Sequence, residues 1–137
     1  MKVKYFDLKN KRVFITGGGS GIGASIVEHF CEQDCEVYFV DINIKESKKL
    51  ISNLKKKKIK APHFIECNLL KIKKLENIIK KIINSKGPID ILINNAANDD
   101  RHSTKQVDEK YWNNRMDVNL KHFFFTIKAV LKGMIQK

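Results

Sequence analysis

The chain has 137 residues, of which 42% are hydrophobic and 31% charged. This length suits one globular domain, and the apolar content is too high for a disordered chain. Lysines interrupt every apolar run well short of the roughly 20 residues that span a membrane, and the first residues lack the apolar core of a secretion signal. Three cysteines, Cys31, Cys35 and Cys67, form no metal-type pairing, so we expect reduced thiols in the cytoplasm and no metal site.

The net charge of +12 is concentrated in one stretch, because residues 44–86 hold 14 lysines against 3 glutamates. Proteins that bind nucleic acids normally use arginine forks and exposed aromatic rings. This stretch has no arginine, and its only rings are His63 and Phe64. We therefore expect the lysines to form the solvated faces of two helices, and a basic nucleic-acid binder remains the least favoured alternative.

Apolar runs and helical patterns alternate along the chain. Short apolar runs, several rich in β-branched residues, predict strands over 12–16, 36–40, 63–67 and 89–93. Apolar residues at helical spacing predict helices over 22–33, 44–58 and 71–84, and mostly helix from about residue 107 to the end. The fold class is therefore α/β: a Rossmann-like, doubly wound parallel sheet, which stops after the fourth strand and the long helix that follows it.

A glycine-rich segment, Gly17–Gly23, joins the first strand to the first helix. Glycines let the backbone turn sharply there and let a phosphate approach without a Cβ in the way. The N-terminus of the helix then offers free N–H groups to a pyrophosphate. A Walker-type loop is excluded, because no Lys-Ser/Thr pair ends the segment.

Asp41 ends the second strand, 18 residues beyond Gly23. A carboxylate at this place can accept hydrogen bonds from both ribose hydroxyls of adenosine, and it repels a 2′-phosphate. The sequence therefore predicts NAD as cofactor in preference to NADP. The alternative is that Asp41 is an ordinary turn residue at the end of a strand.

Three segments together resemble the short-chain dehydrogenase/reductase family: Thr16–Gly23, Asn94-Asn95-Ala96-Ala97 and Val118-Asn119-Leu120. The resemblance covers essentially the whole chain. It implies that the cofactor is bound by Gly17, Ser20, Gly21, Ile22 and Gly23 at the phosphates, Asp41 at the adenosine ribose, Asn68 and Leu69 at the adenine, and Asn95 at the ribose beyond the fourth strand. It also implies that Asn119 is a catalytic residue, which anchors a water in the proton relay of the family. Two positions depart from the family pattern, since Ala97 replaces a glycine and Asn68 an aspartate.

A narrower resemblance involves Asn94–His102, Tyr111–Met116 and Val118–His122, which are similar to members that oxidise aldoses at C1. It implies an NAD-dependent oxidoreductase that acts on CH–OH groups, with a sugar as substrate. His102 is then a candidate for contact with the polyol, or part of a solvated loop. His122 is expected to pack against a neighbouring residue.

The family's catalytic Ser and Tyr-x-x-x-Lys pair have no counterpart in the predicted site. Tyr5 and Lys9 have the spacing but precede the first strand, Tyr111 is followed by Arg115, and Tyr38 lies inside a strand. We therefore expect one NAD(P)-binding domain over residues 1–137, an N-terminal fragment that is inactive alone.

The resemblance also carries expectations about partners. The homologous helix forms a subunit interface in many members, so we expect a homo-oligomer or a complementary C-terminal fragment. Without such a partner, the fourth strand is an open edge, and the final helix lacks apolar contacts for Phe123, Phe124, Val130 and Leu131. A non-catalytic module that binds adenine nucleotides or a protein partner is the alternative function.

Overall fold

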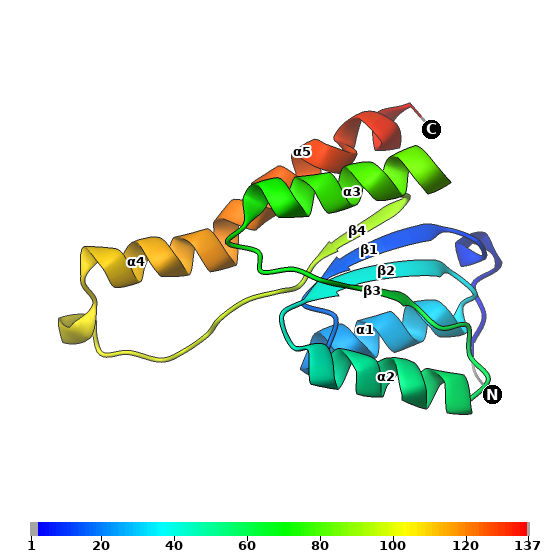
Figure 1. Cartoon of the computed structure of the whole chain (residues 1–137), viewed down its shortest axis with the longest axis horizontal. Coiled ribbons are helices and arrows are strands. Elements are labelled where there is room, and N and C mark those ends of the chain that lie inside the picture. Colours follow the sequence, from blue (N-terminus) through cyan, green and yellow to red (C-terminus); the bar gives the residue numbers. More distant parts are fainter. Residues whose placement is uncertain (1–2, 137) are drawn as a thin grey trace.

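The computed structural model describes residues 3–136, and its centre is a parallel sheet of four strands (Figure 1). The strands are β1 (Arg12–Thr16), β2 (Glu36–Asp41), β3 (His63–Glu66) and β4 (Ile91–Asn94), and their order in the sheet is β3-β2-β1-β4. The chain proceeds from β1 outward to β3 and then crosses to β4 on the other side of β1. The strand order therefore reverses at β1, the point where open α/β sheets bind their ligands.

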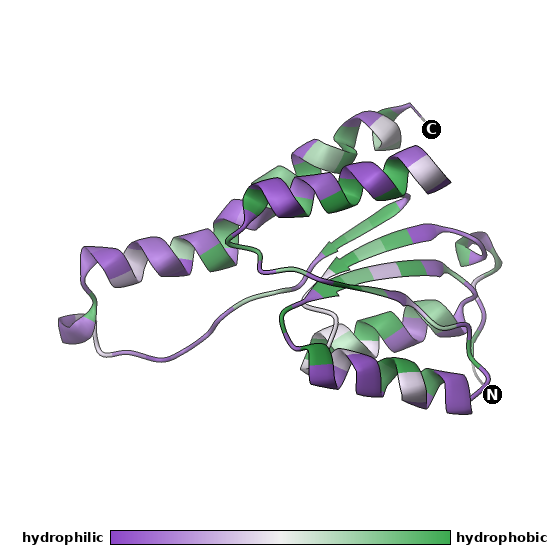
Figure 2. Ribbon diagram, viewed as in Figure 1, coloured by the Kyte–Doolittle hydropathy of each residue, from purple (hydrophilic) through white to green (hydrophobic). Residues whose placement is uncertain are grey.

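Helices cover both faces of the sheet, so the predicted fold class is confirmed (Figure 1). The helices on one face are α1 (Gly21–Glu32) and α2 (Ile44–Lys56), and those on the other are α3 (Ile72–Lys86) and α5 (His122–Ile135). Every strand and the first three helices lie within about two residues of their predicted bounds. Figure 2 shows largely hydrophobic strands between helices that carry many hydrophilic residues.

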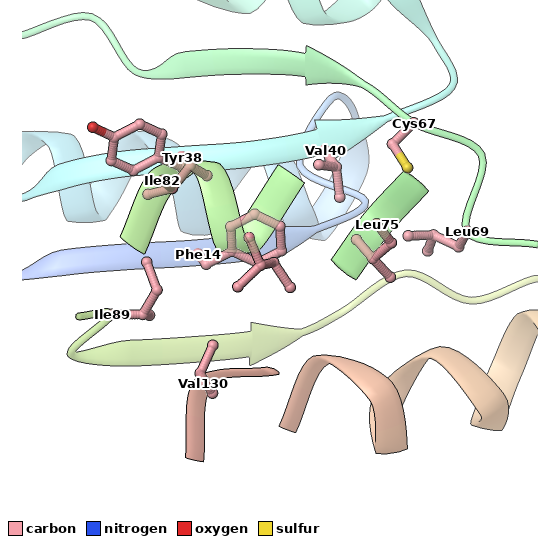
Figure 3. Packing of buried hydrophobic residues seen from close by; sticks show 10 residues of the cluster. Phe14, Tyr38, Val40, Cys67, Leu69, Leu75, Ile82, Ile89 and Val130 are labelled. Carbon is pink, nitrogen blue, oxygen red and sulfur yellow. The ribbon is translucent and has the colours of Figure 1, made fainter. Parts of the chain in front are cut away.

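Each face of the sheet packs against its own hydrophobic core, because successive strand residues point to opposite faces. Between the sheet and α3 lie ten buried residues, which Figure 3 shows: Phe14, Tyr38, Val40, Cys67, Leu69, Leu75, Ile79, Ile82, Ile89 and Val130. The core under α1 and α2 contains Val13, Ile15, Val27, Cys31, Cys35, Val37, Phe39 and Leu54. The lysines of α2 and α3 lie outside both cores, as expected. None of the described helices is long and apolar enough to cross a membrane.

The predicted helix from about residue 107 is interrupted. A 3-10 turn (Thr104–Gln106) comes first, followed by α4 (Glu109–Met116), a π-helical turn (Asp117–Lys121) and then α5. Asp108 starts α4 by accepting a hydrogen bond from the N–H of Tyr111 at 2.7 Å. The π turn carries Asn119, and such turns occur often at functional sites.

Two burial expectations need correction. Ile22, which the helical pattern places on the apolar face of α1, is 77% exposed, and the buried residues of that helix are Gly23, Val27 and Cys31. Val130 does not lack apolar partners, because it is 1% exposed in the core beneath α3. Phe124 and Leu131 are exposed, as expected. Among the described residues, β4 pairs with β1 alone, so it is an edge strand.

We expect Ile79→Ala to lower the free energy of unfolding by about 2–5 kcal/mol, because it opens a cavity in the core beneath α3. Ile135→Ala is the matched control: this isoleucine lies on α5 in the same layer but is 74% exposed, so its loss costs less than about 0.5 kcal/mol. Urea unfolding followed by circular dichroism measures both. Equal effects of the two variants would contradict the described core.

Candidate functional site

A cleft of about 710 Å³ opens at the carboxyl ends of the strands, where the strand order reverses. Its walls are the loop between β1 and α1, the ends of β2 and β3, the segment after β4, and two helical positions, Asn114 and Val118. All nine residues that the sequence assigns to cofactor binding line this one cleft: Gly17, Ser20, Gly21, Ile22, Gly23, Asp41, Asn68, Leu69 and Asn95. They come from four separate stretches of the chain.

The glycine loop brings the start of α1 very close to β1. A Cβ on Gly23 would lie 1.8 Å from the carbonyl oxygen of Gly17, so only glycine lets the helix approach the strand end this closely. Gly21 differs: its φ is +52°, and a Cβ there would meet nothing within 4 Å. Ser20 occupies the N-cap position of α1 without forming a side-chain capping hydrogen bond. The first turn of α1 therefore remains open toward the cleft and can receive an anion.

Asp41 has the turn role that the sequence left open as an alternative, and its predicted contact with the adenosine ribose stays a prediction. Its Oδ2 accepts a hydrogen bond from the N–H of Gly19 at 2.8 Å, and its Oδ1 accepts one from the N–H of Asn43 at 2.8 Å. The carboxylate therefore shapes the turn after β2 and fixes the glycine loop, and it also lines the cleft. Each carboxylate oxygen retains a lone pair, because an ionised carboxylate can accept about four hydrogen bonds.

Asn68 and Leu69 form the wall of the cleft beyond β3. The Oδ1 of Asn68 accepts a hydrogen bond from the N–H of Leu70 at 2.9 Å, which fixes the turn that leads into α3. Leu69 is 9% exposed and packs in the core beneath α3. The pair therefore offers an apolar surface beside an amide whose nitrogen remains available as a donor.

Asn95 holds the end of β4 against the glycine loop. Its Nδ2 donates to the carbonyl oxygens of Gly17 at 2.9 Å and Thr16 at 3.2 Å. Its amide nitrogen is thus committed within the protein, so a contact with a ligand would fall to its side-chain carbonyl oxygen. The predicted ribose contact of Asn95 stays a prediction, and the structure adds a loop-fixing role that the sequence did not indicate.

Asn119 does not line the cleft, but it is hydrogen-bonded to the backbone of Asn98, which does. Its Oδ1 accepts from the N–H of Asn98 at 2.7 Å, and its Nδ2 donates to the carbonyl oxygen of Asn98 at 2.9 Å. The helical residues at the cleft are instead Asn114 and Val118. Neither residue was predicted as part of the site, although their i, i+4 spacing beside Asn119 places them on one helical face.

A buried hydroxyl joins three parts of the site. Thr16 Oγ1 accepts hydrogen bonds from the N–H groups of Asn95 at 3.1 Å and Ala96 at 3.2 Å, and it lies 3.3 Å from Nε2 of His122. Its single O–H therefore points to Nε2, which must be unprotonated. The proton is on Nδ1, which donates to the carbonyl oxygen of Val118 at 2.8 Å. His122 is fully buried, so the expectation that it packs against neighbours is confirmed.

The tyrosines that could replace the family's phenol base lie away from the cleft lining. Tyr38 donates to Oε1 of Glu36 at 2.6 Å, and burial raises the pKa of its phenol. Tyr5 precedes β1, and its N–H donates to Oε1 of Gln33 at the C-terminal end of α1, away from the cleft. Tyr111 lies 2.6 Å from Nδ1 of His102, and both are in the segment after β4.

Burial lowers the pKa of His122 below its ordinary value of 6.5, against the opposing effect of the Val118 hydrogen bond. The unfolded chain therefore takes up a proton first, so the free energy of unfolding should fall as the pH decreases from about 7.5 to about 5.5. His122→Asn should flatten this dependence, whereas the exposed His63→Asn should retain it. Urea unfolding at several pH values tests this, and an unchanged slope in His122→Asn would contradict it.

Comparisons with known proteins place this arrangement in a family. A family model for the short chain dehydrogenases matches residues 11–137. The chain is 42% identical over 130 residues to D-xylose 1-dehydrogenase of Caulobacter vibrioides, covering 95% of this chain and 50% of that protein. It is 39% identical over 128 residues to the probable galactose dehydrogenase of Rhizobium meliloti, covering 93% and 50%.

The fold agrees with this relationship. The solved structure of 2-keto-3-deoxy-D-gluconate dehydrogenase from Streptococcus agalactiae superposes with a TM-score of 0.81 at 35% identity, over 96% of this chain and 49% of that one. The chain spans about half the length of the curated relatives it matches. With three sequence motifs arranged around one cleft, and with this fold, the chain belongs to the short-chain dehydrogenase family of oxidoreductases.

Proposed function

We propose that the chain binds NAD and forms the cofactor-binding part of an aldose 1-dehydrogenase. The observation that carries the proposal is the single cleft, because it places the open N-terminus of α1, the Asp41 carboxylate and the segment after β4 around one continuous space. Its volume of about 710 Å³ lies within the usual range for small-molecule sites. The residues present therefore fit a nicotinamide dinucleotide, the cofactor class of the family.

The proposed contacts follow the cleft from one end to the other. Asn68 and Leu69 would border the adenine, and Asp41 would accept hydrogen bonds from the adenosine ribose. Around Gly21 the first turn of α1 would receive the pyrophosphate, because the open space there lets phosphate oxygens reach the backbone N–H groups. Bound NAD would supply the acceptor for a hydride from the substrate carbon.

The substrate proposal depends on the relatives and on the segment after β4. D-xylose and galactose appear in the names of two relatives that match over most of this chain. Asn98, Asp99 and Asn114 give the far end of the cleft two amides and a carboxylate, groups that suit the hydroxyls of a sugar. We therefore propose an aldose, oxidised at C1, as the substrate of the whole enzyme.

Of the family's catalytic residues, residues 1–137 contain Asn119. Its double hydrogen bond to the backbone of Asn98 fixes the π turn against the segment after β4, and we propose that it anchors the proton-relay water from there. A Ser and a Tyr-x-x-x-Lys pair would have to join this site from elsewhere. Residues 1–137 then act as one NAD(P)-binding domain.

A partner is proposed for the outer surface of α4 and α5. An apolar stripe follows these helices at intervals of three or four residues: Trp112, Met116, Leu120, Phe124, Ile127, Leu131 and Ile135, each at least 38% exposed. An exposed stripe of this length and the open edge of β4 suit a second copy of the chain or a complementary C-terminal segment. The three buried, unpaired thiols support a cytoplasmic location.

We expect NAD to bind more tightly than NADP, because the carboxylate of Asp41 would repel a 2′-phosphate. Asp41→Ala should narrow this preference, and Asp117→Ala, outside the cleft lining, should leave it unchanged. Calorimetric titration of the unmodified chain and of both variants with NAD, NADP and ADP measures these affinities. Equal affinity of the unmodified chain for NAD and NADP would contradict the assignment. Affinity that depends on salt and not on the nucleotide would favour the nucleic-acid alternative.

We expect residues 1–137 alone not to oxidise galactose, xylose or arabinose. General-base catalysis contributes a factor of about 10²–10⁴ in rate, and none of the described tyrosines lines the cleft. The measurement is the absorbance of NADH, with the chain alone and after mixing with a fragment that carries Ser and Tyr-x-x-x-Lys. Rapid turnover by the chain alone would overturn this expectation.

A further inference from the structure

Two of the three segments that carry the narrower resemblance meet in a compact cluster of side chains. Asp100 and His102 come from the loop after β4, whereas Tyr111 and Arg115 come from α4. The Nη2 of Arg115 donates to Oδ2 of Asp100 at 2.9 Å, and its guanidinium carbon lies 4.7 Å from the centre of the Tyr111 ring. The hydroxyl of Tyr111 is 2.6 Å from Nδ1 of His102, and the two ring centres are 4.0 Å apart.

This cluster takes the place of a hydrophobic core in its part of the molecule. The loop after β4 and α4 extend together away from the sheet as an arm, residues 98–116 (Figure 1). Within the arm every residue is exposed or only half-buried, and Figure 2 shows mostly hydrophilic residues along α4. The loop after β4 and α4 are therefore held together by the cluster near the middle of the arm, and by the hydrogen bonds between Asn98 and Asn119 at its base.

Arg115 is the most enclosed charge of the cluster. Its side chain is 19% exposed, against 63% for Asp100. Its Nε and Nη1 are buried without a hydrogen-bond partner among residues 3–136. Unsatisfied donors at a buried guanidinium cost stability, and an apolar side chain would avoid that cost. Arg115 holds the arm together through Asp100 and Tyr111, but because of this cost stability alone does not account for an arginine at this position.

The position of the cluster beside the cleft gives a reason for an arginine at position 115. Asp99, directly before Asp100, lines the cleft, and so does Asn114, directly before Arg115. The Asp100–Arg115 pair thus joins the loop to α4. In each of these two segments, the residue directly before the pair contributes a polar side chain to the cleft.

We propose that Arg115 is a positioning residue: through Asp100 and Tyr111 it sets the distance between the two walls at the substrate end of the cleft. It acts on specificity without contacting the sugar, because Asp99 and Asn114 present the groups that would do so. This inference rests on the proposed function for the identity of the ligand, but the positioning itself concerns the chain alone.

The experiment compares Arg115→Gln, Arg115→Lys and Asp100→Asn with the matched control Arg101→Gln, an exposed arginine in the same loop. Hydrogen exchange of the amides of residues 98–102 reports the loop directly, and the fluorescence of Trp112, the only tryptophan, reports α4. In Arg115→Gln and Asp100→Asn these amides should exchange about five- to tenfold faster. Arg115→Lys should restore part of the protection, and Arg101→Gln should match the unmodified chain.

Titration with NAD and ADP then links the loop to the cleft. Arg115→Gln should weaken NAD severalfold and leave ADP unchanged, since ADP would occupy only the end of the cleft beside Asp41. Unchanged exchange in Arg115→Gln and Asp100→Asn, or equal weakening of NAD and ADP, would overturn the proposal. If the unmodified chain bound no NAD, the proposed function would fail, whereas hydrogen exchange would still decide the role of Arg115.

Discussion

The hydroxyl of Thr16 is the interaction on which the site depends. At the end of β1 it accepts two backbone hydrogen bonds from the segment after β4 and donates to the buried ring of His122. A strand, a loop and the start of α5 therefore meet at one fully buried oxygen. Since both acceptor positions of the hydroxyl are occupied, its O–H points to Nε2, an arrangement that favours the neutral ring of His122. The π turn that precedes α5 is held against the sheet through Val118.

The glycine loop and Asp41 show how the contacts that fold the chain also shape the cleft. Gly23 lets α1 begin in contact with the end of β1, and Asp41 fixes Gly19 from the neighbouring strand. The same close packing leaves the first turn of α1 facing an open space at Gly21. The cleft can therefore receive an anion without any positively charged side chain among the residues that line it, because the helix supplies the positive end of its dipole.

The molecule combines two kinds of stabilisation. The sheet and its four helices pack around two apolar cores, in which Phe14 and Phe39 are completely buried. The arm after β4 depends instead on an ion pair, a ring contact and the asparagine pair at its base. Such contacts are individually weak in water, so the arm is the part of the cleft most easily adjusted. The part that we propose for adenosine lies at the ends of the sheet strands, and the part that we propose for the substrate lies on the arm.

The sequence by itself determined the strands, the first three helices and nine of the residues that line the cleft, because each depends on local spacing. A glycine loop after one strand and Asp41 after the next are brought together by any parallel sheet of this order. The tertiary structure alone decided the π turn at Asn119, the burial of Val130 and the exposure of Ile22. It also decided the pairing of Asp100 with Arg115. Periodicity predicts that a residue lies on a helix face, but the neighbour that covers this face comes from distant parts of the chain. Val130 is buried because α3 lies beside α5, and Ile22 is exposed because the cleft opens beside it.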